Sequence, residues 1–129
     1  MVRNADDLLA NVASRAEQVI DARSTGRFAG ADAEPRPTKK AGHIPGSLNQ
    51  PFNDLMNPEA GVIRPADEIA AAFDRAGVDR TQPMVTTCGS GITAAFLSFS
   101  LYLIGVENAA VYDGSWAEWG NHADTPVDT

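Results

Sequence analysis

The chain has 129 residues, 43% of them hydrophobic and 21% charged, a composition that fits one folded domain with a sizeable core. The formal net charge of -7 argues against a nucleic-acid partner, because binding phosphates needs a basic surface. A single cysteine excludes an internal disulfide framework and a cysteine-built zinc site, and no apolar run approaches the roughly 20 residues that cross a membrane. The first residues also lack the apolar core of a signal peptide, so we expect a cytoplasmic protein. We expect it to use no metal and no other cofactor.

Strand and helix patterns alternate through the first half of the chain. We expect a helix over residues 5–13, capped by Asn4 and apolar on one face, and then a short buried strand over 18–22. Residues 29–51 are rich in proline and glycine, which prevents any long regular element. Within them, only residues 47–49 resemble a strand.

The second half continues the alternation. Pro65 suits the first position of a helix that ends at Gly77. The further expected elements are a strand over 83–87, a helix from 92 to about 104, a strand over 109–112, and a short helix whose Trp116 and Trp119 pack against the sheet. The polar tail, residues 123–129, is expected to be loose. This order predicts one α/β domain over residues 1–129, with a mainly parallel sheet and helices on both faces.

The only cysteine, Cys88, stands between the strand over 83–87 and the helix that follows it. A glycine-rich turn at this point, Gly89-Ser90-Gly91, directs backbone N–H groups toward one spot, and the helix N-terminus adds a positive partial charge. Such a spot stabilises an anion, and a thiolate is an anion. The alternative is a buried cysteine that acts as a small apolar side chain. Because open α/β sheets bind ligands at the carboxyl ends of their strands, we interpret Cys88 as a nucleophile.

Two arginines follow the strand over 18–22. In a parallel sheet, Arg23 and Arg27 reach the same edge as Cys88, although each could equally be a solvated surface charge. The acidic chain repels anionic substrates at long range, so any anion site must be built locally from backbone dipoles and well-placed arginines. His43 is a candidate general base, but the rigid Pro45-Gly46 turn beside it favours a structural role.

Four sequence blocks in this order resemble the rhodanese family of sulfurtransferases. They are Val19-Ile20-Asp21-Ala22-Arg23 with Arg27-Phe28, Gly42-His43-Ile44-Pro45-Gly46-Ser47-Leu48-Asn49, the Cys88 loop, and Val111-Tyr112-Asp113-Gly114-Ser115-Trp116 with Glu118-Trp119. The resemblance spans nearly the whole chain and is greatest to the carboxy-terminal catalytic domain of two-domain enzymes. The loop from Cys88 to Thr93 resembles 3-mercaptopyruvate sulfurtransferases, whereas thiosulfate-preferring relatives carry basic residues in place of Gly89 and Ser90.

The resemblance implies a two-step sulfur transfer. The Cys88 thiolate would take sulfur from a small anionic donor, 3-mercaptopyruvate or secondly thiosulfate, and pass it from a persulfide to a thiol, cyanide or thioredoxin-like acceptor. Arg23, with Arg27 beside it, would bind the donor's carboxylate. Ser90 is a candidate proton relay, and the remaining expected substrate-binding residues are Gly89, Gly91, Ile92 and Thr93. A second rhodanese-like domain is an expected partner, because the two-domain enzymes have their active site between the halves.

Two other functions compete with this interpretation. A rhodanese-like module that binds a partner or senses oxidants through Cys88 would share the fold. Some dual-specificity phosphatases also share it, but their loop ends in an arginine, in the pattern Cys-x5-Arg, that clamps the phosphate. This chain has Ala94 at that position, which disfavours a phosphatase.

Overall fold

The computed structural model, which describes residues 1–129, is built on a five-stranded sheet in the order β1-β7-β6-β2-β3. All four strand pairs in this sheet are parallel. The strands are β1 (Val2–Arg3), β2 (Gln18–Asp21), β3 (Leu48–Asn49), β6 (Met84–Thr87) and β7 (Ala110–Tyr112). The prediction of an α/β domain with a mainly parallel sheet is therefore confirmed.

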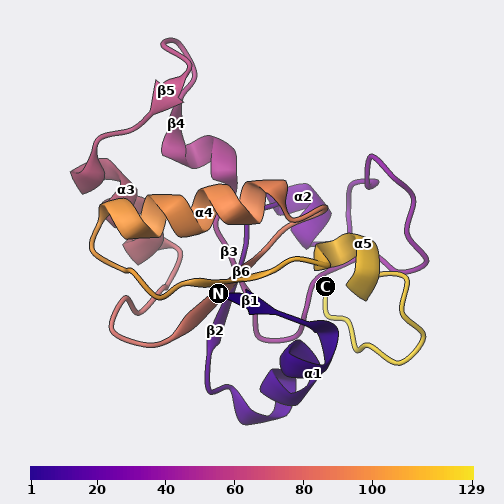
Figure 1. The fold of residues 1–129 in the computed structure, drawn as a ribbon. Helices are drawn as coiled ribbons and strands as arrows, with labels where there is room; N and C mark the ends of the chain where they lie inside the picture. The colour runs from indigo at the N-terminus through magenta and orange to yellow at the C-terminus, as the bar shows by residue number, and fades with distance from the viewer.

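Helices cover both faces of the sheet (Figure 1). They are α1 (Ala5–Ser14), α2 (Thr25–Phe28), α3 (Ala66–Arg75), α4 (Ile92–Leu103) and α5 (Ser115–Trp119), with a 3-10 turn, η1, over Phe52–Leu55. One apolar core lies under α3, α4 and η1, and a second lies under α1 and α5. Neighbouring strand residues alternate between the two cores: Val19 and Val85 enter the second, and Ile20 and Met84 the first. Trp116 and Trp119, which we expect to pack against the sheet, are both buried in the second core.

The sequence reading missed several short elements. These are β1, α2, η1, and a hairpin of antiparallel strands β4 (Met56–Asn57) and β5 (Val62–Ile63), which projects at the top of Figure 1. Strands of two residues carry too little alternation to be recognised, and the hairpin's Val62 is 55% exposed. The bounds of the other helices and strands differ from the expected ones by about a residue at either end.

The tail over residues 123–129 is mostly exposed but is anchored to the domain by hydrogen bonds, so it is not the loose end that the sequence indicates. Trp119 Nε1 donates to Pro126 O at 2.8 Å, and the Thr125 hydroxyl donates to Trp119 O at 2.6 Å. Asp128 pairs with His43 through backbone hydrogen bonds in both directions. Polar composition alone did not reveal this, because the tail is anchored through backbone groups and two short polar contacts.

The strand order places a topological switch point at one edge of the sheet. From β2 the sheet extends outward to β3, and from β6 it extends the other way to β7, so the loops after β2 and β6 diverge. Ligands of open α/β sheets bind at such a switch point. Asp21 pairs with Thr87 in the parallel register, and Ala22 N donates to Thr87 O at 2.8 Å, which places the two loops side by side. None of the helices is both long and apolar enough to cross a membrane.

Candidate active site

The loop from Cys88 to Gly91 joins the central strand β6 to α4 and depends on glycine at its end. Gly91, the N-cap of α4, has φ 101°, a left-handed conformation that favours glycine. A Cβ atom at this position would lie 2.8 Å from the carbonyl oxygen of Asp113. Gly91 therefore permits both the tight turn and the close approach of the chain between β7 and α5.

The Cys88 thiol faces this loop. Its sulfur accepts the backbone N–H of Gly91, with an N–Sγ distance of 2.9 Å, and lies 3.9 Å from the Ser115 hydroxyl oxygen. Cys88 is only 1% exposed, and it packs at the edge of the core under α4. The sulfur thus lies at the floor of the loop, within reach of a backbone dipole rather than turned away from it.

Helix α5 binds the opposite side of the same loop. Trp116 N donates to Cys88 O at 2.8 Å, and Ala117 N donates to Gly89 O at 2.9 Å. In a trans peptide the N–H and C=O point in opposite directions, so these bonds turn the N–H groups of Gly89 and Ser90 away from α5. Several N–H groups of the loop and of the first turn of α4 donate no hydrogen bond within the chain: those of Gly89, Ser90, Ile92, Thr93 and Ala94. They form a set of free donors next to the thiol, which suits an anion.

Arg27 supplies a positive charge beside the loop. Its guanidinium forms a two-point ion pair with Glu34 at 3.0 and 2.7 Å, while its side chain keeps 25% exposure. A Cβ built on Gly89 would lie 2.5 Å from an Arg27 guanidinium nitrogen, so the arginine lies directly over this glycine. The hydrogen bond to Glu34 is the main cause that raises the pKa of Arg27 above its ordinary value.

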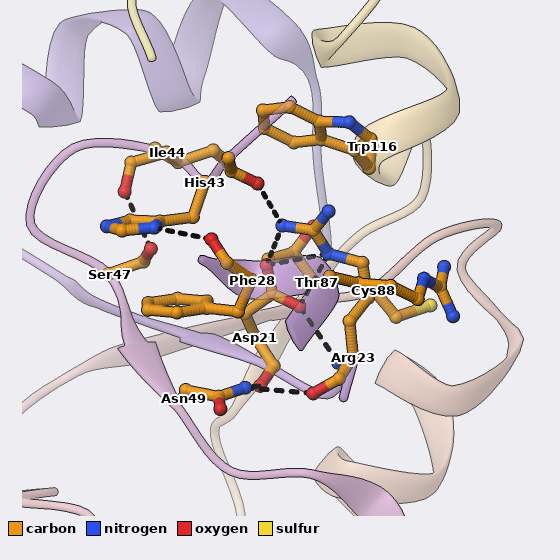
Figure 2. Close-up of polar contacts among 12 residues, drawn as sticks. Asp21, Arg23, Phe28, His43, Ile44, Ser47, Asn49, Thr87, Cys88 and Trp116 are labelled. Atoms are coloured by element: carbon orange, nitrogen blue, oxygen red, sulfur yellow. Dashed lines mark hydrogen bonds and ion pairs between the residues drawn. The ribbon is translucent and has the colours of Figure 1, made fainter. Parts of the chain in front are cut away.

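Arg23 lies in the interior, where its side chain is 1% exposed. Its guanidinium bonds both carboxylate oxygens of Asp21, and one of its nitrogens also donates to Gly42 O at 2.7 Å (Figure 2). The other terminal nitrogen contacts Glu34 at 3.3 Å, and the guanidinium carbon lies 4.5 Å from the centre of the Trp116 ring. The expected binding of a substrate carboxylate by Arg23 stays a prediction, but its donors are largely engaged by these buried groups.

The segment after Arg23 is fixed by neutral contacts. Asn49 donates to the backbone oxygens of Asp21 and Arg23 at 3.1 and 2.9 Å. The ring of His43 stacks on Phe28 with 3.8 Å between centroids, and its Nδ1 lies 2.8 Å from Phe28 O (Figure 2). These contacts agree with the structural role expected for His43.

The other expected site residues lie around the loop without side-chain bonds of their own. Ser90 is exposed, Thr93 is half-buried and Ile92 is 78% exposed, and their roles stay predictions. Two residues that contact the site were missed by the sequence reading, Glu34 and Ser115. They lie seven residues from Arg27 and 27 from Cys88, and no local pattern links them to those partners. No group of three or more potential metal-ligating side chains comes together in the structure.

Fold and loop together define an α/β domain with a cysteine in a turn of free backbone N–H groups, and comparison with known proteins gives its family. A family model described as the rhodanese-like domain matches residues 4–122, so the chain belongs to the rhodanese-like family.

Relatives of this domain are longer proteins. The chain is 43% identical to a 3-mercaptopyruvate sulfurtransferase of Escherichia coli, over 99% of this chain and 44% of that protein. It is 36% identical to a thiosulfate sulfurtransferase of Bos taurus, over 95% of this chain and 41% of that protein. Among solved structures, the Tum1 protein of Saccharomyces cerevisiae matches with a TM-score of 0.82 and 33% identity, covering 92% of this chain and 42% of that one. The chain thus spans less than half the length of these relatives.

Proposed function

We propose that this chain is a sulfurtransferase domain in which Cys88 carries sulfane sulfur, as a persulfide, from a donor to an acceptor. The observation that supports this most directly is the position of the thiol. Its sulfur accepts the Gly91 N–H at 2.9 Å, in a loop where the N–H groups of Gly89 and Ser90 have no partner within the chain. Such a loop stabilises anions, and both the thiolate and the persulfide are anions.

The first step loads the enzyme with sulfur. Cys88 Sγ attacks the sulfur of 3-mercaptopyruvate, an S–S bond forms, and the C–S bond breaks with its electron pair leaving on carbon as the enolate of pyruvate. The thiol proton of the donor ends on that carbon, so thiolate and donor give a persulfide anion and pyruvate. Ser90, whose side chain is exposed at the rim of the loop, is the proposed relay for this proton.

The second step unloads it. An acceptor thiolate attacks the outer sulfur, the S–S bond breaks, and the Cys88 thiolate is regenerated. Cyanide or a thioredoxin-like thiol fits the same step. We further infer that a second rhodanese-like domain completes the substrate cleft, because the matched relatives are more than twice the length of this chain. A cytoplasmic, reducing setting would keep the lone thiol free for this cycle.

The preference for 3-mercaptopyruvate over thiosulfate is supported by the charges near the sulfur. No cationic side chain occurs in the loop from Cys88 to Thr93, so a compact dianion such as thiosulfate finds only neutral donors from this loop at the reacting sulfur. A donor whose carboxylate lies a few bonds from its sulfur reaches Arg27 instead, and that arginine keeps one terminal nitrogen outside its pair with Glu34. The greater identity to the relative named for 3-mercaptopyruvate agrees with this assignment.

Arg36 is the second cation we assign to the donor's carboxylate. It is exposed, it enters none of the ion pairs in the structure, and it lies two residues after Glu34, which is bound to Arg27. With Arg23 engaged in the interior, Arg27 and Arg36 are the arginines of this region that retain free donors. The sequence reading passed over Arg36 because it lies in a proline-rich loop.

The mass of the intact protein tests the proposal. After incubation with 3-mercaptopyruvate and removal of the donor, the wild-type protein should gain the mass of one sulfur atom, and added thiol should remove it. Cys88→Ala should gain nothing. The rate of loading should be higher with 3-mercaptopyruvate than with thiosulfate. A wild-type protein that gains no sulfur from either donor would falsify the proposed function.

A further inference from the structure

Ser115, at the first position of α5, has an unusual backbone conformation for a residue in the interior. It has φ 52°, and it is fully buried. The other non-glycine residue with positive φ, Arg15, is an exposed cap at the end of α1. Left-handed conformations are uncommon for residues with a Cβ, and such residues often occur at functional sites. Glycine would fit this position with less strain, so the serine side chain is the feature to explain.

The Ser115 hydroxyl ties the nucleophile to the ends of two strands. It donates to Tyr112 O, at the end of β7, with an O–O distance of 2.9 Å. Its oxygen then accepts the backbone N–H of Cys88 at 3.1 Å, and the Thr87 hydroxyl at 3.4 Å. One donor and two lone pairs are thereby used, which is the full capacity of a hydroxyl group.

This contact completes the hydrogen bonding of the Cys88 main chain. The N–H of Cys88 is held by the Ser115 side chain, and its carbonyl oxygen is held by the N–H of the next residue, Trp116. Fixing both peptide units sets the direction of the Cα–Cβ bond, and rotation about that bond then gives the sulfur its place. That place, 2.9 Å from Gly91 N, is the one that stabilises a thiolate. Ser115 itself stays 3.9 Å from the sulfur, too far for a strong bond to it.

We propose that Ser115 is a positioning residue for the Cys88 nucleophile, acting through the Cys88 backbone N–H rather than on the substrate. Its importance for sulfur transfer rests on the proposed function, whereas its effect on the reactivity of the thiol does not. The strained backbone at Ser115 allows its hydroxyl to reach the Cys88 N–H. Removing the hydroxyl should leave Arg27 and donor binding intact while the sulfur becomes less well placed for attack.

Two substitutions of Ser115 distinguish the effect of losing the hydroxyl from the effect of the backbone conformation. Ser115→Ala removes the hydroxyl and keeps the Cβ, and Ser115→Gly removes both but suits the positive φ, so it should remain folded if the alanine variant does not. The matched control is Ser100→Ala, because Ser100 is also fully buried and its hydroxyl bonds only a backbone oxygen, Phe96 O at 2.9 Å, within α4. Thermal unfolding of each variant confirms that it is folded.

Two rates are then measured. In a single turnover with 3-mercaptopyruvate, sulfur loading should slow about tenfold in both Ser115 variants, with KM for the donor changed less than twofold and no change in Ser100→Ala. Alkylation of Cys88 by iodoacetamide at neutral pH should slow by a similar factor. If wild-type protein gains no sulfur, the proposed function fails, and alkylation alone decides the role of Ser115. Alkylation as fast as in wild type, or faster, in the folded Ser115→Gly variant overturns the inference, as does wild-type loading in that variant.

Discussion

The loop after β2 is held by charged side chains, whereas the loop after β6 is held by backbone groups and one serine hydroxyl. Ion pairs link four side chains after or within β2, those of Asp21, Arg23, Glu34 and Arg27. All of these side chains except Arg27 are nearly buried. The Cys88 loop has no charged side chain, and its carbonyls bond to the first turn of α5. The two loops lie next to each other, so an acidic protein can offer an anion both an arginine and uncompensated N–H groups at one edge.

The difference indicates how each region should respond to substitution. A buried ion pair costs desolvation energy that its partners must offset, so loss of one member leaves an uncompensated charge. A backbone loop has no such charge to expose, and it is sensitive to shape instead. Loss of a buried ion-pair partner should therefore reduce stability most, and a change of shape in the neutral loop should reduce activity most.

The largest expected effect on stability is that of Arg23→Met. The substitution keeps a long apolar stem but leaves Asp21 buried without its cation and Glu34 with only Arg27, at a cost of about 3–5 kcal/mol in the free energy of unfolding. Urea denaturation measures this loss. Arg80→Met, which removes an exposed ion pair with Asp74, should cost less than about 1 kcal/mol. Equal losses in the two variants would contradict the structural role of Arg23.

Gly91→Ala should damage the neutral loop. The new Cβ would meet Asp113 O at 2.8 Å and would strain a residue at φ 101°, so we expect about 1–3 kcal/mol of destabilisation and about a 100-fold slower loading of sulfur. Gly61→Ala is the control, because Gly61 also has positive φ, 68°, but a Cβ there meets nothing within 4 Å. Loading in the control should match wild type; a Gly91→Ala protein that loads as fast as the control contradicts the role of the turn.

Arg27→Gln tests the contact between Arg27, which follows β2, and the Cys88 loop. Loss of the guanidinium over Gly89 should raise KM for 3-mercaptopyruvate about tenfold or more, since a charge-assisted bond to the carboxylate is lost. Arg27→Lys should recover only part of this, because an ammonium cannot pair with Glu34 and a carboxylate in the same planar geometry. Steady-state kinetics distinguish the cases. An unchanged KM in Arg27→Gln, measured beside Arg36→Gln, would assign the carboxylate to Arg36 alone.

The smallest expected effect is on the pH dependence of stability, through Tyr112 at the end of β7. Burial, and then the hydrogen bond to Glu118 at 2.6 Å, raise the pKa of Tyr112 above its ordinary value of about 10. The native state therefore holds this proton more tightly than the unfolded state, and its contribution to stability is complete below about pH 10 and decreases above it. Tyr112→Phe should show a shallower loss of melting temperature between pH 9 and 11. Tyr102→Phe, at an exposed position, should follow wild type, and identical slopes in all three proteins would refute the assignment.

Much of this arrangement could be predicted from local sequence. The β-branched runs of β2 and β6 identified the two strands, and the glycines around Cys88 identified the turn. Pairing over long distances could not be predicted. Arg23 was placed at the correct edge, but the inward turn of its side chain depends on Glu34 and on Trp116, 93 residues further along the chain. The role of Ser115 was missed for the same reason, since nothing near Cys88 in the sequence indicates a partner 27 residues away.

The hydrogen bonds from Trp116 and Ala117 also make the Cys88 loop depend on a segment that follows it in the chain. A polypeptide that has folded only as far as α4 has its cysteine and its glycines, yet the carbonyls of residues 88 and 89 have only water to bond. The loop geometry proposed for sulfur transfer is therefore complete only when α5 has packed against it.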